Sequence, residues 1–300
     1  MTKYYTRACN FYYGSQAKLL IKKNQALPLC GNTLVAFDKI EIFKRSKKKV
    51  QSKIIHVKKI KSLSKTFRTK IKKDIKNITC KRINFLKHIN FSSPIVMGVL
   101  NLTPDSFSDG GKFNKKQKSF EHISQMIKSG AQIIDIGGES TRPGSQTINP
   151  KKEWKRVEYV VKNFKKKFKN ICFSLDTRKS FLMLKAISHG VDIINDVSGF
   201  KFEKSSLLKL KKFKTPKVLH HMQGTPKTMQ VRPRYKHVLL DIYDFFEKNI
   251  KSLNGNMKII LDPGIGFGKT LKHNLTLISK ISLFHSLGLP ILVGTSRKRF

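Results

Sequence analysis

Three polar residues directly follow short apolar runs in the second half of the sequence. Asp176, Asn195 and Asp262 supply two acids and one amide at corresponding positions. Together they can recognise a heterocycle with adjacent N–H and carbonyl groups, because a carboxylate accepts from N–H donors while an amide both donates and accepts. The alternative is that each residue caps a helix, a position that Asp and Asn favour. Asp262 precedes Pro263 and Gly264 and caps no predicted helix, which favours a binding role for it.

Two polar, glycine-rich loops lie closer to the N-terminus, each directly after an apolar run. They are NLTPDSFSDGGKF at residues 101–113 and GGESTRPGS at residues 137–145, and the second places Arg142 between a hydroxyl residue and a proline. Taken alone, such segments can be simple turns. Two long loops of this kind on one side of a fold are typical of mobile loops that close over a substrate.

Basic residues and histidines stand near three further run ends. Lys269 closes GIGFGK, a segment that could bring backbone N–H groups and Lys269 itself close to a ligand, although it is not a Walker A sequence. Lys298, within TSRKRF, suits an anion or an electron-rich ring, and solvent exposure is the alternative. Of the adjacent His220 and His221 only one can face the inner side of a strand. We favour His221 as the residue that enters the site.

From Pro94 onward, seven apolar runs of strand length alternate with helix-length segments, which predicts a parallel α/β sheet. Polar residues end every run. In a TIM barrel all such positions share one rim, whereas an open doubly wound sheet divides them. No GxGxxG follows the first run, so the pattern favours a TIM (β/α)8 barrel. The predicted strands are Ile95–Leu100, Ile133–Ile136, Cys172–Leu175, Asp192–Ile194, Lys217–Leu219, Lys258–Leu261 and Ile291–Val293, and the predicted helices are 118–129, 151–168, 179–189, 203–213, 235–253 and 271–287.

Eight segments of residues 94–300 resemble, in the same order, the signature segments of the dihydropteroate synthase family. They are MGVLNLTPDSFSDGGKF, IIDIGGESTRPGS, SLDTRKS, IINDVSGF, HHMQGTPKTMQ, ILDPGIGFGKT, HNL and VGTSRKRF. The resemblance implies a TIM-barrel transferase of folate biosynthesis. In its reaction, p-aminobenzoate displaces diphosphate from 6-hydroxymethyl-7,8-dihydropterin diphosphate and gives 7,8-dihydropteroate.

Carried over residue by residue, the resemblance also implies a site and its partners. Asn101, Arg142 and Lys298 are expected to take part in catalysis, and the family precedent implies a homodimer. A single protein ligand suits Mg²⁺, which keeps several waters and binds substrate phosphates. The implied residues are Asp176, Asn195, Met222, Asp262 and Lys298 at the pterin, Thr141 and Arg142 at the diphosphate, Phe267 and Ser296 at p-aminobenzoate, and Asn101 at the metal.

The sequence departs from the family at its C-terminal end. Members of the family have an eighth strand, with a basic residue and a histidine that help to hold the diphosphate, and two further helices. This sequence stops at Phe300, directly after the seventh predicted strand. A barrel lacking one strand leaves two unpaired edges and an open core. We therefore expect a barrel truncated after the seventh strand, as a fragment of a longer chain or, less favoured, an inactive remnant.

The first 90 residues differ in composition from the rest. The chain has 62 Lys+Arg against 18 Asp+Glu, a formal net charge of +44, and residues 41–90 hold eighteen basic and two acidic residues. Basic surface attracts nucleic acid, but aromatic platforms for it are sparse in this segment, so nucleic acid is not favoured as a partner. We predict a lysine-rich extension or small accessory region at 1–90 and the pterin-binding barrel at 91–300. KTFRTKIKKDIKNI is compatible with a basic helix.

Cysteine and hydropathy patterns narrow the remaining classes. The four cysteines form no CxxC pair, so we predict free thiols and no zinc site. No apolar run of about 18 residues exists, so we predict no membrane contact and a cytoplasmic protein. The remaining enzyme alternative is a pterin-binding methyltransferase. It does not require a loop for diphosphate, so the intact loops at 101–113 and 137–145 favour the synthase.

Overall fold

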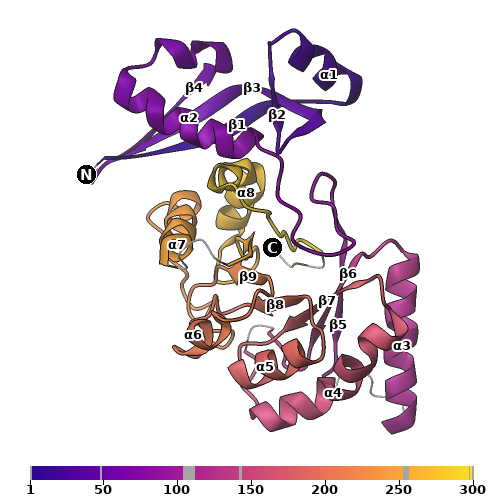
Figure 1. Cartoon of the computed structure of the whole chain (residues 1–300). Helices are drawn as coiled ribbons and strands as arrows, with labels where there is room; N and C mark the ends of the chain where they lie inside the picture. The colour runs from indigo at the N-terminus through magenta and orange to yellow at the C-terminus, as the bar shows by residue number, and fades with distance from the viewer. Residues whose placement is uncertain are drawn as a thin grey trace. The chain divides into compact units, whose positions relative to one another are not determined.

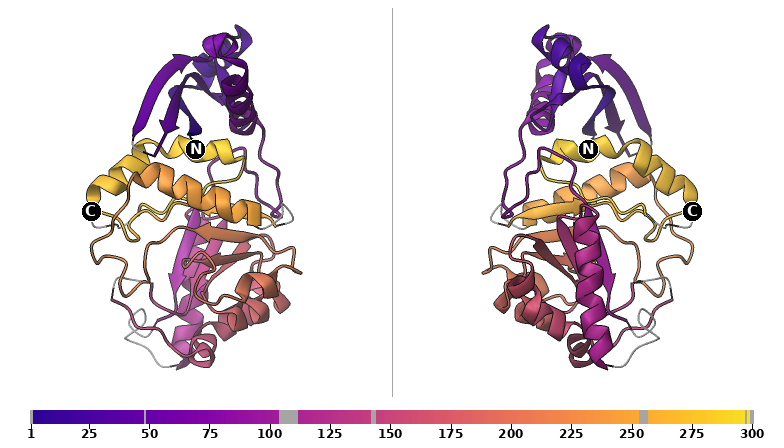
Figure 2. Two further views of the ribbon diagram at one scale, coloured as in Figure 1. Left: turned by 90° about the vertical axis from the view of Figure 1, so that its left-hand side faces the viewer. Right: turned by 90° about the vertical axis from the view of Figure 1, so that its right-hand side faces the viewer.

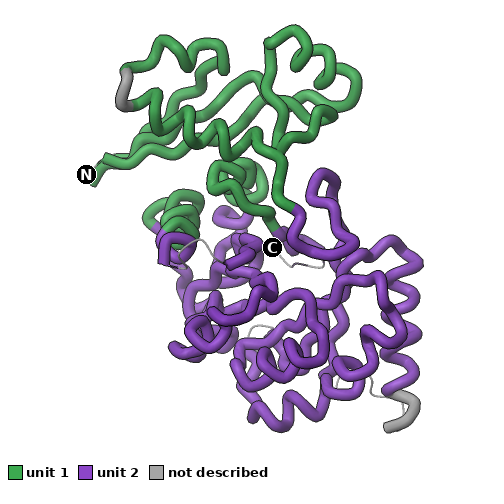
Figure 3. The backbone as a smooth tube through the Cα atoms, in the orientation of Figure 1, with its two compact units in different colours: residues 1–83, 236–247, 275–291 green, residues 84–235, 248–274, 292–300 purple. Residues whose placement is uncertain are grey.

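The computed structural model describes residues 2–47, 49–103, 112–141, 144–252, 257–296 and 298. The chain forms two compact units, shown in different colours in Figure 3. Unit 1 comprises residues 1–83, 236–247 and 275–291, and unit 2 comprises residues 84–235, 248–274 and 292–300. Unit 1 therefore combines the basic N-terminal region with two later segments of the chain.

Unit 1 contains a four-stranded antiparallel sheet in which the long strand β3 pairs with the other three strands. Successive side chains of a strand point to opposite faces, so the Lys-interrupted apolar pattern becomes two different surfaces. Helix α2 lies where the sequence is compatible with a basic helix. The elements of this region are β1 (Lys3–Tyr13), α1 (Gly14–Lys22), β2 (Leu27–Leu29), β3 (Asn32–Arg45), β4 (Val50–His56), η1 (Val57–Ser62) and α2 (Lys65–Thr79) (Figure 1).

One set of sheet side chains is apolar and packs against α2. Ala8, Ile40 and Ile42 form one buried cluster with Ile71 and Ile78 of that helix. At 25 cal/mol per Å² of apolar surface, burying each isoleucine side chain stabilises the fold by roughly 2 kcal/mol. The apolar positions of β1 and β3 thus explain why this lysine-rich region folds.

Other sheet side chains are basic and contact acidic residues of α7 (Val238–Ser252). Arg45 Nη2 lies 2.6 Å from Asp241 Oδ1, and Arg45 Nη1 lies 3.2 Å from Asp244 Oδ2. Lys3 pairs with Asp244 and, at 2.8 Å, with Glu247. Acidic residues three apart lie on one face of a helix, so α7 presents an acidic stripe to the basic sheet.

Unit 2 is built on a six-stranded parallel sheet whose strands follow one another in chain order, from β5 to β10. A doubly wound sheet would reverse its strand order at a switch point, and this sheet does not. The prediction of a parallel α/β fold is confirmed. Helix α3 packs along β5 (Figure 2). The elements are β5 (Met97–Asn101), α3 (Lys112–Lys128), β6 (Ile133–Gly137), α4 (Pro150–Lys167), β7 (Cys172–Asp176), α5 (Ser180–Ser188), β8 (Ile193–Asp196), α6 (Ser206–Leu210), β9 (Lys217–His220) and β10 (Ile259–Asp262). Helix α8 (Leu271–Ser279) begins in unit 2 and ends in unit 1, and η3 (Ile281–Leu287) belongs to unit 1.

The seventh predicted strand, Ile291–Val293, is shorter in the structure than expected. Ile291 forms a single bridge, and Leu292 N donates to Leu261 O at 2.8 Å. The preceding Pro290 has no N–H to donate, so pairing with β10 starts only at this point. The predicted helix 271–287 is also divided, into α8 and the 3₁₀ turn η3.

Apolar residues close the N-terminal ends of the parallel strands. The loop before β5 supplies Leu86 and Ile89 to this core, with Phe85 and Phe91 packed against it. The strand residues of the cluster are Ile133, Cys172, Ile193, Val218 and Ile260. The polar residues consequently gather at the opposite, carboxyl ends of the strands. In the described residues, no helix has the length and apolar character needed to cross a membrane.

Candidate active site

The carboxyl ends of the strands bring the predicted polar residues to one edge of the sheet. Asp176, at the end of β7, is the register partner of Asn195 in β8. Asp262, at the end of β10, is the register partner of His220 in β9. Parallel pairing therefore places Asp176 beside Asn195 and Asp262 beside His220, all at the carboxyl edge of one sheet.

A buried amide–carboxylate pair lies between the strand ends. Asn195 Nδ2 donates to Asp135 Oδ2 at 2.9 Å, and the two residues are 8% and 4% exposed. Asn195 Oδ1 and Asp135 Oδ1 are buried and have no hydrogen-bond partner in the described part of the chain. An unsatisfied buried polar group costs about 1–3 kcal/mol. These two acceptors are thus placed to receive donors from a ligand.

Asp176 serves no cap, because the N-cap residue of α5 is Lys179. A Cβ added to Gly137 would lie 3.3 Å from Asn101 Oδ1 and 3.5 Å from Asp176 Oδ2, so these side chains meet over a residue that has none of its own. Burial raises the pKa of Asp176 well above its usual range, and the carboxylates of Asp135 and Asp196 raise it further. Asp176 is therefore a buried carboxyl group that accepts hydrogen bonds when it is ionised and can donate one when it is protonated.

The two carboxylate oxygens of Asp262 have different neighbours. Its Oδ1 accepts from Gly264 N at 2.8 Å, and its Oδ2 lies 3.9 Å from His220 Nε2. The Val197 carbonyl oxygen accepts from His220 Nδ1 at 2.8 Å, and burial lowers the pKa of His220. His220, not His221, is thus the histidine beside Asp262, contrary to the sequence-based preference.

The loop after β10 is held by a buried lysine. Lys269 is 4% exposed, and its Nζ donates to Gly264 O at 2.7 Å, Phe267 O at 2.9 Å and His221 O at 3.2 Å. Burial lowers the pKa of Lys269 to about 7. The expectation that Lys269 reaches toward a ligand is replaced by a structural role, in which it ties the loop to β9.

The same loop presents Phe267 to Lys298. Lys298 Nζ lies 4.2 Å from the centroid of the Phe267 ring, and a Cβ on Gly266 would meet Lys298 Cδ at 2.9 Å. Burial lowers the pKa of Lys298, while the Asp262 carboxylate acts in the opposite direction. A cation, an aromatic face and a carboxylate are therefore assembled from two segments of unit 2.

The remaining predicted residues differ in burial, and some of them lie outside the described residues. Met222 is buried at 4% exposure, Thr141 is half-buried and Ser296 is exposed. Arg142 and residues 104–111 of the first polar loop lie outside the described residues. The sequence pattern includes Asp135, within IIDIGG, among the polar residues near the strand ends, but it did not predict a binding role for this residue.

A hollow of about 860 Å³ lies elsewhere, between the outer helices α3 and α4. Its lining includes Phe120 and Tyr159 together with Lys116, whose Nζ lies over the Tyr159 ring at 4.6 Å. It contains none of the strand-end residues. The strand ends therefore remain the candidate active site.

Comparisons with known proteins identify the family of this chain. The profile of the family described as pterin-binding enzymes matches residues 97–300. The dihydropteroate synthase of Escherichia coli strain K12 is 42% identical over 214 residues, covering 70% of this chain and 75% of the relative. That of Neisseria meningitidis serogroup C is 42% identical over 217 residues, covering 70% of this chain and 76% of the relative.

Solved structures give the same result. Dihydropteroate synthase of Yersinia pestis with a sulfonamide drug complex has a TM-score of 0.65 and 41% identity, covering 70% of this chain and 77% of that one. The Xanthomonas albilineans enzyme with 4-aminobenzoic acid has a TM-score of 0.64 and 33% identity, covering 70% and 76%.

The parallel sheet, its polar strand ends and the matching profile together define a pterin-binding α/β enzyme. Synthases and methyltransferases both fit that description, and the relatives separate them. The chain belongs to the dihydropteroate synthase family. Its activity is that of a transferase of folate biosynthesis, condensing p-aminobenzoate with 6-hydroxymethyl-7,8-dihydropterin diphosphate to form 7,8-dihydropteroate and diphosphate.

Proposed function

We propose that Asn195, Asp262 and Asp176 bind the pterin ring of the diphosphate substrate, with Met222 beneath it. The observation that supports this best is the pair of buried acceptors, Asn195 Oδ1 and Asp135 Oδ1, without partners among the described residues. The ring N–H and amino groups of a dihydropterin are donors that such acceptors require. Charge-assisted hydrogen bonds to the carboxylates would add affinity and fix the orientation of the ring.

The diphosphate is proposed to lie near Asn101, Thr141 and Arg142. Asn101 Oδ1 and the Asp176 carboxylate approach the same point over Gly137. The Asn101 amide oxygen suits an ion with one protein oxygen ligand, as Mg²⁺ permits. When bound, Mg²⁺ would neutralise charge on the diphosphate.

The p-aminobenzoate subsite is proposed to include Phe267 and Ser296, beside Lys298 of the pterin site. The cation at Lys298 suits a carboxylate or an electron-rich ring, and the Phe267 face offers apolar contact. The relative from Xanthomonas albilineans was solved with 4-aminobenzoic acid, and that from Yersinia pestis with a sulfonamide drug complex. These relatives support an aminobenzoate-shaped subsite in this chain as well.

The residues proposed here recognise and orient; they form no nucleophile–base pair of the kind that covalent catalysis requires. The reaction suits such a site. The bond between the exocyclic carbon and the diphosphate oxygen breaks, and the electron-rich pterin shares the resulting positive charge. The aniline nitrogen then forms the new C–N bond and releases its proton to solvent. Arg142 is proposed to stabilise the departing negative charge.

The six-stranded sheet is further proposed to form six of the strands of a TIM (β/α)8 barrel. Its strand order, without reversal, and the likeness to solved dihydropteroate synthases support this proposal. We also propose a homodimer, following the family. Light scattering should then give twice the 34.5 kDa mass of the chain, and a monomer mass at micromolar concentration would refute the dimer.

The raised pKa of Asp176 predicts how activity depends on pH. A protonated carboxyl group loses one acceptor, so pterin diphosphate binding should weaken as pH falls through this pKa. The acid limb of kcat/KM for the pterin substrate, which reports groups of the free enzyme, should lie above the ordinary carboxyl range of about 4. In Asp176→Asn the limb should disappear, together with much of the activity at neutral pH.

Asp196 is the other nearby carboxyl group whose titration could produce the acid limb. Burial raises the pKa of Asp196 to about 6, but its carboxylate accepts from Ser198 N at 2.7 Å and Phe200 N at 3.1 Å. It is thus occupied by the backbone of its own loop. An acid limb that persists near pH 6 in Asp176→Asn would assign the titration to Asp196 and show that the proposed role of Asp176 is wrong.

A further inference from the structure

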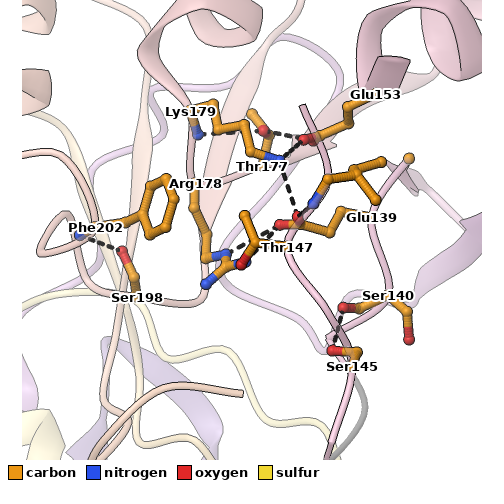
Figure 4. Close-up of polar contacts among 12 residues, drawn as sticks. Glu139, Ser140, Ser145, Thr147, Glu153, Thr177, Arg178, Lys179, Ser198 and Phe202 are labelled. Carbon is orange, nitrogen blue, oxygen red and sulfur yellow. Dashed lines mark hydrogen bonds and ion pairs between the residues drawn. The ribbon is translucent and has the colours of Figure 1, made fainter. Parts of the chain in front are cut away.

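Two cations and two carboxylates form a continuous buried network beside the loop that carries Thr141 (Figure 4). Lys179 Nζ lies 2.9 Å from Glu139 Oε1 and also pairs with Glu153. Arg178 Nη2 lies 2.6 Å from Glu139 Oε2. Each residue is at most 5% exposed. Charges withdrawn from water in this way persist only when they are paired and hydrogen-bonded, which these are.

Glu139 occupies the centre of the network and joins three segments. It follows β6 at the beginning of the loop, and its Oε1 also accepts from Ile148 N at 2.8 Å, nine residues further on. Arg178 and Lys179 come from the turn after β7, and Glu153 comes from the first turn of α4. Hydrogen bonds from Lys179 and Arg178 outweigh the effect of burial and hold the pKa of Glu139 below its usual value.

Further contacts fix the described residues on both sides of Thr141. Ser145 Oγ donates to Ser140 O at 2.7 Å, and Gly144 N donates to Pro226 O at 3.2 Å. Arg178 Nη2 reaches Thr147 Oγ1 at 3.3 Å. The loop therefore has an internal brace, and its two ends share one carboxylate.

We propose that Glu139 and Arg178, supported by Lys179, are positioning residues that hold the Thr141 loop in the arrangement needed for the diphosphate group. They act through the loop. Their effect is that the site binds a pterin bearing the diphosphate more tightly than the same pterin without it. This inference rests on the proposed role of Thr141 in binding the diphosphate. Bidentate, charge-assisted pairs have a fixed geometry, and small displacements of binding groups are costly to both affinity and rate.

The test compares two ligands that share one ring. Calorimetry gives Kd for 6-hydroxymethyl-7,8-dihydropterin diphosphate and for 6-hydroxymethyl-7,8-dihydropterin, with the full chain. The preference is the Kd of the dihydropterin divided by the Kd of its diphosphate. It should fall about 10-fold in Glu139→Gln. In Arg178→Met it should fall roughly threefold, because Lys179 still pairs with Glu139 and Glu153 in that variant. The Kd of the dihydropterin should not change. If the network only stabilised the fold, its loss would weaken the binding of both ligands.

Two further variants separate the possible failures. Asp192→Asn removes a carboxylate that pairs with Lys165 and accepts from Phe173 N at 2.7 Å; it precedes β8, away from the strand ends, and should leave the preference unchanged. Thr141→Ala should lower the preference, and no change there would overturn the proposed diphosphate site itself. If Thr141→Ala lowers it while folded Glu139→Gln or Arg178→Met does not, the positioning role is refuted.

Discussion

Replacing Asp262 by Asn should weaken binding of 6-hydroxymethyl-7,8-dihydropterin diphosphate about 100-fold, or roughly 2.7 kcal/mol. One oxygen of Asp262 already accepts from Gly264 N at 2.8 Å. In the variant the remaining carbonyl oxygen keeps that contact, so the new NH₂ group points toward the ligand. The NH₂ donor of the variant then faces the N–H and amino donors of the pterin, where Asp262 offers an acceptor. The hydrogen bond is lost, and the facing donors are left without a partner.

Calorimetric titration measures this loss, with KM for p-aminobenzoate as an internal comparison that should change little. Asp38→Asn is the matched control, because Asp38 is hydrogen-bonded to Asn10 and Tyr12 within unit 1. It should bind the pterin substrate as the natural chain does. An Asp262→Asn protein that keeps its thermal stability and loses less than about threefold in affinity would show that Asp262 is not a pterin ligand.

The sequence was most informative where local pattern and position coincide. Six apolar runs became β5 to β10, because buried parallel strands are near-continuous hydrophobic runs. The polar residue at each run end then had to lie at the carboxyl edge of the sheet. This is why the sequence places Asp176, Asn195 and Asp262 at the ends of successive or nearby strands, and the register pairing of Asp176 with Asn195 agrees with that placement.

Long-range pairing explains what the sequence did not indicate. The basic N-terminal region forms an antiparallel sheet because Ala8 and Ile40 are buried against α2, a partnership between segments far apart in the chain. The acidic stripe Asp241, Asp244 and Glu247 gave a local signal in its spacing, but its basic partners precede it by about 200 residues. Likewise, the role of Lys269 depends on carbonyl groups whose directions no sequence pattern specifies.

Gly264→Ala should lower the free energy of unfolding by at least about 3 kcal/mol and abolish most of the activity. Gly264 has a φ of +66°, and an added Cβ would lie 2.0 Å from His221 O and 3.0 Å from His220 Cε1. Neither group can yield easily. Lys269 holds the carbonyl oxygens of both Gly264 and His221, so relief of the clash must move the loop after β10.

The same displacement would reach the ligand site, because Gly264 N is the donor that orients the Asp262 carboxylate. Gly130→Ala separates the steric effect from backbone strain: Gly130 has a φ of +97°, and an added Cβ there meets nothing within 4 Å. It should cost only about 1 kcal/mol. Denaturant unfolding of both variants measures the difference, and steady-state assays measure the activity. Equal losses of stability would mean that β9 and the loop have room for a methyl group and that the close approach does not fix Asp262.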